Sequence, residues 1–92
     1  MDEMNRLREL LDKEDIAWVD NTSKKVARTQ SPDWNDWHSQ SKNRWSCICG
    51  AYTYGGPQGM LEVWFGDNDP QGWLTAKEAL ELIKSRVGRC FT

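Results

Sequence analysis

The pattern of hydrophobic and polar residues predicts one helix near each end of the chain. The first helix, expected over residues 3–13, has an apolar stripe at three- and four-residue spacing that consists of Met4, Leu7, Leu10 and Leu11. The second is expected to have Thr75 as its N-cap, because Thr75 and Glu78 have the spacing of a capping box, and to end at Gly88. Its apolar stripe consists of Ala76, Ala79, Leu80, Ile83 and Val87.

Four segments between these helices have the composition and alternation of short β-strands. They comprise residues 16–20, 25–29, 44–49 and 60–65. The first two flank the turn-prone Asn21-Thr22-Ser23 and predict a hairpin. The order α-β-β-β-β-α contains no βαβ unit, so the simplest solution is an α+β fold with a four-stranded antiparallel sheet covered by two helices. A chain of 92 residues is expected to form one domain, residues 1–92.

The last two predicted strands carry apolar residues on both faces. On the final strand, one face has Leu61, Val63 and Phe65, and the other has Met60, Glu62 and Trp64. Two helices cover one face of such a sheet, so the other must be covered by the long polar segment 30–43 or by a second subunit. The second possibility predicts a homo-oligomer.

Composition and charge disfavour several classes of function. The net charge is −2, but residues 21–60 carry five basic and two acidic residues, for +3. This balance disfavours duplex nucleic acid, which calls for a strongly basic face, and still suits a small anion. No segment approaches the roughly 18 apolar residues of a membrane span, and the first residues lack the apolar region of a secretory signal. We therefore expect a cytoplasmic protein.

The sequence does not predict a metal site, a cofactor site or a set of catalytic residues. Cys47 and Cys49 lie two residues apart on one predicted strand, a poor geometry for a disulfide, and free thiols are expected. C-x-C spacing with a single histidine, His38, does not predict a zinc site. Nucleophilic catalysis needs a base beside the nucleophile, and His38 stands alone. We therefore expect a non-enzymatic protein without a cofactor.

The glycine- and tyrosine-rich loop after Cys49 is the first candidate for ligand binding. Residues 50–55 have the outer spacing of a P-loop, but Gly56-Pro57 stands where Lys and Ser or Thr are required, and a strand follows instead of a helix. The remaining hypothesis is that backbone N–H groups approach an anion, tyrosines stack on a planar ring, and basic residues enter from the adjacent strand end. The candidate residues are Lys42, Arg44, Tyr52, Tyr54, Gly55 and Gly56. The alternative is an ordinary hairpin loop.

Trp34 and Trp37 extend this candidate site. Both lie in the polar segment 30–43, and a long irregular connection in a small domain is often functional. Tryptophans on such a segment suit a binding surface. The alternative is that they pack back on the domain.

A second candidate site, for calcium, begins at Asp67. Counted as a twelve-residue calcium loop, the segment places Asp69, Gly72 and Glu78 at positions 3, 6 and 12. It departs from such a loop at Pro70, and a strand precedes it where a helix is usual. The alternative is an Asp-rich turn followed by a capping box that already employs Glu78.

Two stretches resemble small uncharacterised proteins encoded by bacteriophages and prophages. The shared patterns are W-S-x-I-C-G … Y-G-G-x-Q-G-x-L-E-x-W, from Trp45 to Trp64, and G-W-L-T-A-x-E, from Gly72 to Glu78. Together they cover roughly the C-terminal half of the chain. The resemblance implies an antagonist of host defence, either a sponge for a nucleotide immune signal or a direct inhibitor of a defence protein. It carries no catalytic residues.

The leading hypothesis is therefore a phage-type anti-defence protein that sequesters a small phosphorylated, nucleotide-type ligand. The glycine–tyrosine loop, the two basic residues before it and the tryptophans of segment 30–43 would form the pocket. The second hypothesis is a protein–protein inhibitor of a bacterial defence system, similar to anti-CRISPR proteins, with Trp34, Trp37 and the acidic helix faces as its contact surface. The third is a calcium-binding or purely structural module.

Overall fold

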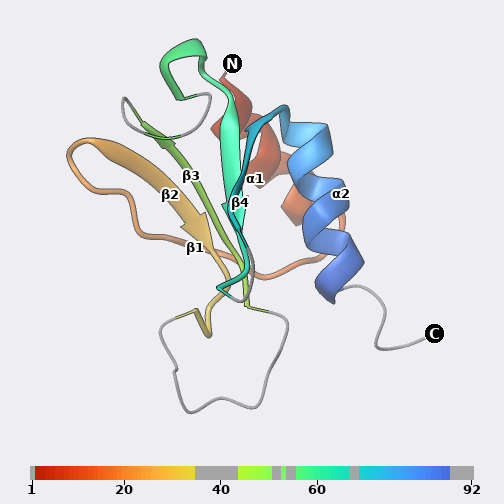
Figure 1. Cartoon of the computed structure of the whole chain (residues 1–92). Helices are drawn as coiled ribbons and strands as arrows, with labels where there is room; N and C mark the ends of the chain where they lie inside the picture. Colours follow the sequence, from red (N-terminus) through yellow and green to blue (C-terminus); the bar gives the residue numbers. More distant parts are fainter. Residues whose placement is uncertain (1, 35–43, 51–52, 54–55, 67–68, 88–92) are drawn as a thin grey trace.

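A computed structural model describes residues 2–34, 44–50, 53, 56–66 and 69–87. Figure 1 shows an antiparallel sheet with two helices on one side of it. The helices are α1 (Glu3–Lys13) and α2 (Ala76–Val87), with a short 3-10 turn, η1 (Gly56–Gln58), between two of the strands. The strands are β1 (Val19–Asp20), β2 (Val26–Gln30), β3 (Ser46–Gly50), β4 (Leu61–Trp64) and β5 (Gln71–Leu74). The expected α+β class is confirmed.

The described sheet has five strands in the order β1-β2-β3-β4-β5, and every neighbouring pair is antiparallel. The prediction of four strands was therefore wrong, because β5 lies in the segment interpreted as a turn or a calcium loop. Pro70 and Gly72 are typical of turns, and an irregularity interrupts the pairing of β5 with β4. Burial alternates along β5, but the sequence of this segment does not alternate between polar and apolar residues, which is the pattern that identifies a strand.

Both helices begin where the sequence predicts, and each has a capped N-terminus. α1 spans the predicted residues, and the Asp2 carboxylate accepts a hydrogen bond of 2.8 Å from a backbone N–H of the first turn. At α2 the capping box is formed: Thr75 Oγ1 accepts from the Glu78 N–H at 3.2 Å, and Glu78 Oε1 accepts from the Thr75 N–H at 2.9 Å. Glu3 Oε1 accepts from the Ala76 N–H at 2.6 Å, which ties the beginning of α2 to the beginning of α1.

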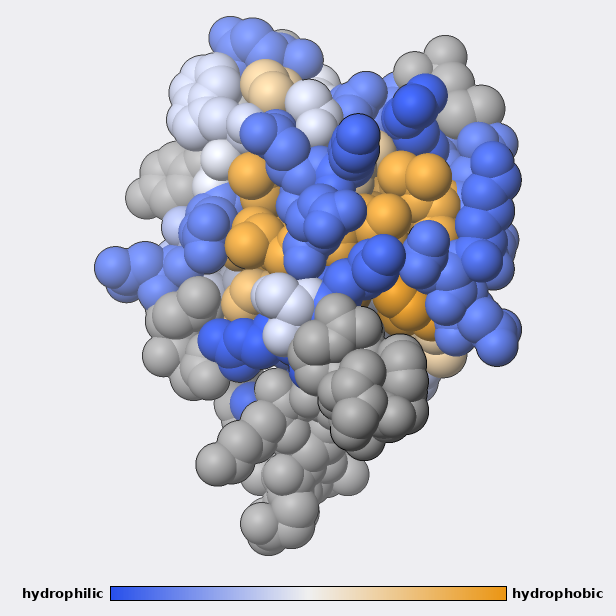
Figure 2. All heavy atoms as spheres, turned by 90° about the vertical axis from the view of Figure 1, so that its right-hand side faces the viewer, coloured by the Kyte–Doolittle hydropathy of each residue, from blue (hydrophilic) through white to orange (hydrophobic). Residues whose placement is uncertain are grey.

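The hydrophobic core lies between the two helices and one face of the sheet. Its buried residues are Met4, Leu7, Leu11, Trp45, Cys47, Leu61, Val63, Phe65, Ala76, Ala79, Leu80 and Ile83. Figure 2 shows the side of the molecule that carries α2. Hydrophobic residues reach the surface there in several areas, and hydrophilic residues lie between these areas. No helix within the described ranges is long and apolar enough to cross a bilayer.

The Arg8 side chain connects α1 to the hairpin of β1 and β2 through hydrogen bonds. Its Nε donates to Thr29 Oγ1 at 2.6 Å, and its Nη2 donates to Asp20 Oδ1 at 3.1 Å and to the Arg28 carbonyl at 3.2 Å. Hydrogen bonds to a charged group are stronger than those between neutral groups, so this side chain orients the helix on the sheet. The hairpin is formed as predicted, although β1 is shorter than the expected residues 16–20.

Candidate functional site

The face of the sheet opposite the helices carries a hollow of about 130 Å³, which we call the sheet hollow. Its lining residues are Arg28, Trp34, Ser46, Ile48, Glu62 and Trp64. Trp34 comes from the segment after β2, and the others lie on β2, β3 and β4. Side chains alternate along each strand, so the neighbours of core residues such as Cys47 and Val63 point to this opposite face.

The strand register arranges the lining residues in two rows across the sheet. Arg28 pairs with Ile48, and Ile48 pairs with Glu62, so an apolar side chain lies between a cation and a carboxylate. Two strand spacings, about 10 Å, separate the Cα atoms of Arg28 and Glu62. In the adjacent row Ser46 pairs with Trp64. The sheet hollow therefore has an apolar centre with charges of opposite sign on its two sides.

Trp34 and Trp64 form the aromatic wall of the sheet hollow. Their ring centroids are 5.6 Å apart and their planes make an angle of 63°, an edge-to-face contact. Trp34 is 7% exposed and Trp64 is 37% exposed, so Trp64 keeps an accessible surface. Arg44 holds Trp34 in place: its Nη1 donates to the Trp34 carbonyl at 3.1 Å, and its guanidinium lies 5.5 Å from the centroid of the Trp34 ring.

The structure brings two of the predicted site residues together, Trp34 and Arg44. Trp34 packs back on the domain, which was the alternative to a binding role, and it covers part of the face that the helices leave open. Gly56 lies in η1, near the opposite end of β3. The candidates that lie outside the described residues are Lys42, Tyr52, Tyr54, Gly55 and Trp37.

Gly56 is required by the fold of its own loop. A Cβ atom at this position would lie 1.7 Å from the Gly50 carbonyl oxygen, so no larger residue fits without a shift of the backbone. The Gly56 N–H donates to the Thr53 carbonyl at 3.0 Å, and the Thr53 N–H donates to the Gly50 carbonyl at 3.2 Å. These two N–H groups are used within the loop and are not directed at an anion.

The candidate calcium segment contains β5, so it departs from the twelve-residue loop on which the calcium hypothesis depends. The Glu78 carboxylate accepts a hydrogen bond within the capping box of α2. Asp69 is exposed, and Asp67 lies outside the described residues. Within the described part of the chain, no group of three or more His, Cys, Asp or Glu side chains is placed to hold a metal ion.

Cys47 and Cys49 are free thiols, as expected. Burial raises the pKa of the Cys47 thiol far above its usual range. Burial, and then the charge of Asp2, also raises the pKa of Cys49. A raised pKa reduces the fraction of thiolate at neutral pH, so neither side chain is activated as a nucleophile.

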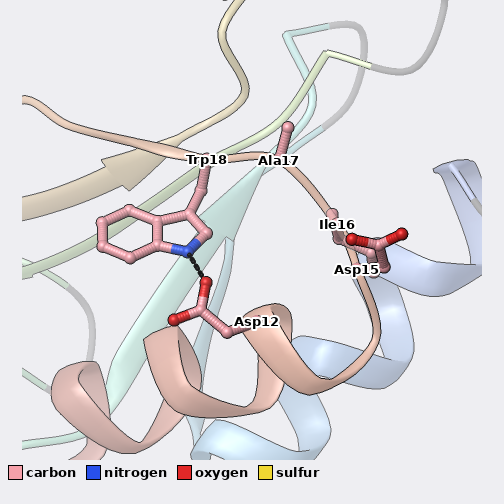
Figure 3. A pocket seen from close by; sticks show the side chains of 5 residues that line it. All are labelled: Asp12, Asp15, Ile16, Ala17 and Trp18. Carbon is pink, nitrogen blue, oxygen red and sulfur yellow. Dashed lines mark hydrogen bonds between the residues drawn. The ribbon is translucent and has the colours of Figure 1, made fainter.

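A second cavity, of about 420 Å³, lies beside the C-terminal end of α1. Figure 3 shows its lining residues, Asp12, Asp15, Ile16, Ala17 and Trp18. Trp18 Nε1 donates to Asp12 Oδ1 at 2.9 Å, which holds the indole over the helix. Residues 16–18 thus lie against α1, which explains why β1 is shorter than predicted. The two carboxylates of this cavity are exposed, and they offer too few ligands for a metal ion.

Alternation in the sequence places Glu62 and Trp64 on the same face of their strand, but it does not tell which face the helices cover. The residues of the sheet hollow that were not predicted as site residues are therefore Arg28, Ser46, Ile48, Glu62 and Trp64. Comparison with protein-family models, with curated proteins and with solved structures finds no match for the chain. The fold and the hollow define a small α+β domain with an aromatic-walled recess on its helix-free sheet face, apolar at its centre and charged at its two sides.

Proposed function

We propose that this chain is a non-enzymatic binding protein that sequesters a small nucleotide-type ligand at the sheet hollow. The observation that carries the proposal is the combination, in one hollow, of the accessible Trp64 ring, the Arg28 guanidinium and the Glu62 carboxylate. An aromatic surface stacks with a nucleobase, a guanidinium binds phosphate, and a carboxylate accepts hydrogen bonds from N–H groups of a base edge. The base and the phosphate of a nucleotide thus each have a matching group.

The size of the sheet hollow fits one part of such a ligand. At about 130 Å³ it is smaller than the roughly 300–1,000 Å³ of pockets that enclose a whole ligand. In our proposal the base occupies the hollow, and the sugar and phosphate extend toward the basic turn between β1 and β2, where Lys24 and Lys25 are exposed. Further candidates for contact with the ligand are Trp37, Lys42, Tyr52, Tyr54 and Gly55.

The proposed biological setting is a phage antagonist of host defence that acts in the host cytoplasm. It is supported by the resemblance of Trp45–Trp64 and Gly72–Glu78 to small phage proteins. A sponge must hold an immune signal without converting it. A nucleotide recovered from the complex is therefore expected to be chemically unchanged, which mass spectrometry of the released ligand would measure.

Thermal shift and isothermal titration with GMP, AMP, cyclic di-GMP, cyclic di-AMP and ADP-ribose test the proposal. At least one of these nucleotides is expected to raise the melting temperature. Trp64→Leu is expected to weaken its binding roughly ten- to a hundredfold, because stacking on an aromatic side chain contributes about 1–3 kcal/mol per base. Trp73→Leu, which removes an exposed tryptophan of β5, is the matched control and should leave the affinity unchanged. An equal loss in both variants, or no stabilisation by any nucleotide, would contradict the proposal.

The second candidate function is direct inhibition of a host defence protein, and Trp73 is the observation that favours it. Trp73 is 58% exposed on the edge strand β5, and its φ of 62° is unusual for a bulky residue. Exposed tryptophans are frequent anchors of protein interfaces. A purified host protein that binds the wild type and not Trp73→Leu, together with no response to any nucleotide, would favour this candidate. Trp34, proposed for this role from the sequence, is buried.

A further inference from the structure

We infer that the sheet hollow selects nucleotides that end in a phosphate monoester, and that Arg28 is the residue that binds this phosphate. The inference rests on the proposed nucleotide-binding function and adds the chemical class of the ligand. Two observations carry it: the Arg28 guanidinium lines the hollow without a partner among the described residues, and the hairpin that carries Arg28 has an excess of positive charge.

Arg28 is fixed by its backbone, and its side chain stays available to a ligand. Its N–H donates to Thr22 Oγ1 at 3.2 Å, and its carbonyl accepts from the Asn21 N–H at 3.0 Å and from Arg8 Nη2 at 3.2 Å. Arg28 is half-buried, and its guanidinium has no hydrogen bond or ion pair with any described residue. The N–H groups of this guanidinium are therefore free to donate to an anion.

The hairpin of β1 and β2 carries more positive than negative charge. Its one acidic residue is Asp20, and its basic residues are Lys24, Lys25 and Arg28. The Asp20 side chain is directed to the helix side of the sheet, where its Oδ1 accepts from Arg8 Nη2 at 3.1 Å. Arg28 is directed to the opposite, helix-free face. Asp20 therefore does not neutralise the positive charge at the Arg28 side of the sheet hollow.

The arrangement of charges in the sheet hollow directs a bound phosphate to its Arg28 side. Ile48 lies between Arg28 and Glu62, whose Cα atoms are about 10 Å apart. An anion is attracted by the guanidinium and repelled by the carboxylate on the far side. A nucleotide whose base lies on the Trp64 ring is therefore expected to extend its phosphate toward β2 and the basic turn.

A phosphate monoester is a stronger ligand for a guanidinium than a phosphodiester. A monoester carries close to two negative charges at neutral pH and has three terminal oxygens. A diester carries one negative charge and has two such oxygens. A guanidinium donates to two oxygens in parallel, and its attraction to the phosphate increases with the charge. Of the nucleotides named above, GMP and AMP contain a monoester, whereas the cyclic dinucleotides and ADP-ribose do not.

Titrations with matched ligands test the inference without any mutation. AMP is compared with 3′,5′-cyclic AMP and adenosine, and GMP is compared with 3′,5′-cyclic GMP and guanosine, so the base stays the same within each series. In at least one series the monophosphate is expected to bind about tenfold or more tightly than the cyclic nucleotide. The nucleoside, which has no phosphate, should bind most weakly.

Arg28→Gln tests the residue itself. It removes the positive charge, so the monophosphate should bind about tenfold more weakly, and the cyclic nucleotide should stay within about threefold of its affinity for the wild type. A purely structural role of Arg28 would weaken both ligands by the same factor. Circular dichroism and the melting temperature establish that the variant is folded. Arg6→Gln, the same substitution at an exposed position of α1, is the matched control and should leave both affinities unchanged.

The possible outcomes separate the inference from the function on which it rests. A cyclic nucleotide that binds as tightly as its monophosphate, or an equal loss of both ligands in Arg28→Gln, would overturn the inference and leave nucleotide binding in place. Binding of a cyclic dinucleotide or ADP-ribose without binding of either monophosphate would do the same. Failure of every nucleotide to bind would overturn nucleotide binding and the inference together. If Arg28→Gln does not fold, the titrations of the wild type alone decide.

Discussion

At the scale of single residues, three tryptophans differ in how deeply they are buried, and their roles differ accordingly. Trp45 is part of the core, Trp34 covers part of the helix-free sheet face, and Trp64 keeps an accessible ring. Alternation in the sequence already separates Trp45 and its partners from the residues that face the other way. It could not show that the helices cover the Cys47 side, because that choice depends on how whole elements pack.

The thiols give a prediction at this scale. Because the pKa of Cys47 and that of Cys49 are both raised, little thiolate is present at neutral pH, and Cys47 is also fully buried. Iodoacetamide at pH 7 should therefore leave Cys47 unmodified in the folded protein and modify it after unfolding in urea. Peptide mapping by mass spectrometry distinguishes this site from Cys90. Rapid modification of Cys47 without unfolding would show that the core is not packed as described.

At the scale of elements, the sequence predicts both helices well, because the first has a clear apolar stripe and the second has an apolar stripe and a capping box. The strands β2, β3 and β4 were also predicted, with boundaries that differ by a few residues. β5 was missed because it is an irregular edge strand that contains Gly72 and follows Pro70. The sheet hollow was missed because its residues come from three strands and meet through register, which local patterns do not specify.

The contact between α1 and the β1–β2 hairpin gives a prediction about pH. Hydrogen bonds from Thr22, and then the charge of Arg8, lower the pKa of the Asp20 carboxyl below its ordinary value of 3.8. A lowered folded-state pKa means that the charged carboxylate stabilises the fold above the unfolded-state pKa, and that this contribution is lost as the pH falls through the folded-state value. Asp20→Asn is therefore expected to lower the urea midpoint at pH 7, with a difference that narrows below about pH 4.

Glu9→Gln is the matched control for this experiment, because Glu9 is an exposed residue of α1. Its urea midpoint at pH 7 should stay close to that of the wild type. A difference between Asp20→Asn and the wild type that stays constant from pH 7 to pH 3 would show that the charge of Asp20 does not contribute.

At the scale of the whole molecule, both helices lie on one face of the sheet and leave the other face with accessible apolar side chains, among them Val19 and Trp64. Self-association through this face stays a prediction, and it would compete with ligand binding at the sheet hollow because both use the Trp64 ring. Size-exclusion chromatography with light scattering at micromolar concentration is expected to give a mass above that of one chain, and Trp64→Glu is expected to reduce it to one chain. A strict monomer for the wild type would remove the prediction.

The backbone of the edge strand β5 affects whether another molecule can add a strand to the sheet. A strand at the edge of a sheet presents unpaired peptide groups, and regular edges of this kind add strands from other molecules until fibrils form. In β5, the pairing with β4 is interrupted by a register shift, and the backbone of Trp73 has a left-handed conformation. Both irregularities bend the strand, so the N–H and C=O groups along its outer edge do not form a straight row. An incoming strand therefore finds no continuous row of hydrogen-bonding groups. The same irregularity that concealed β5 in the sequence therefore disfavours the addition of a further strand at this edge.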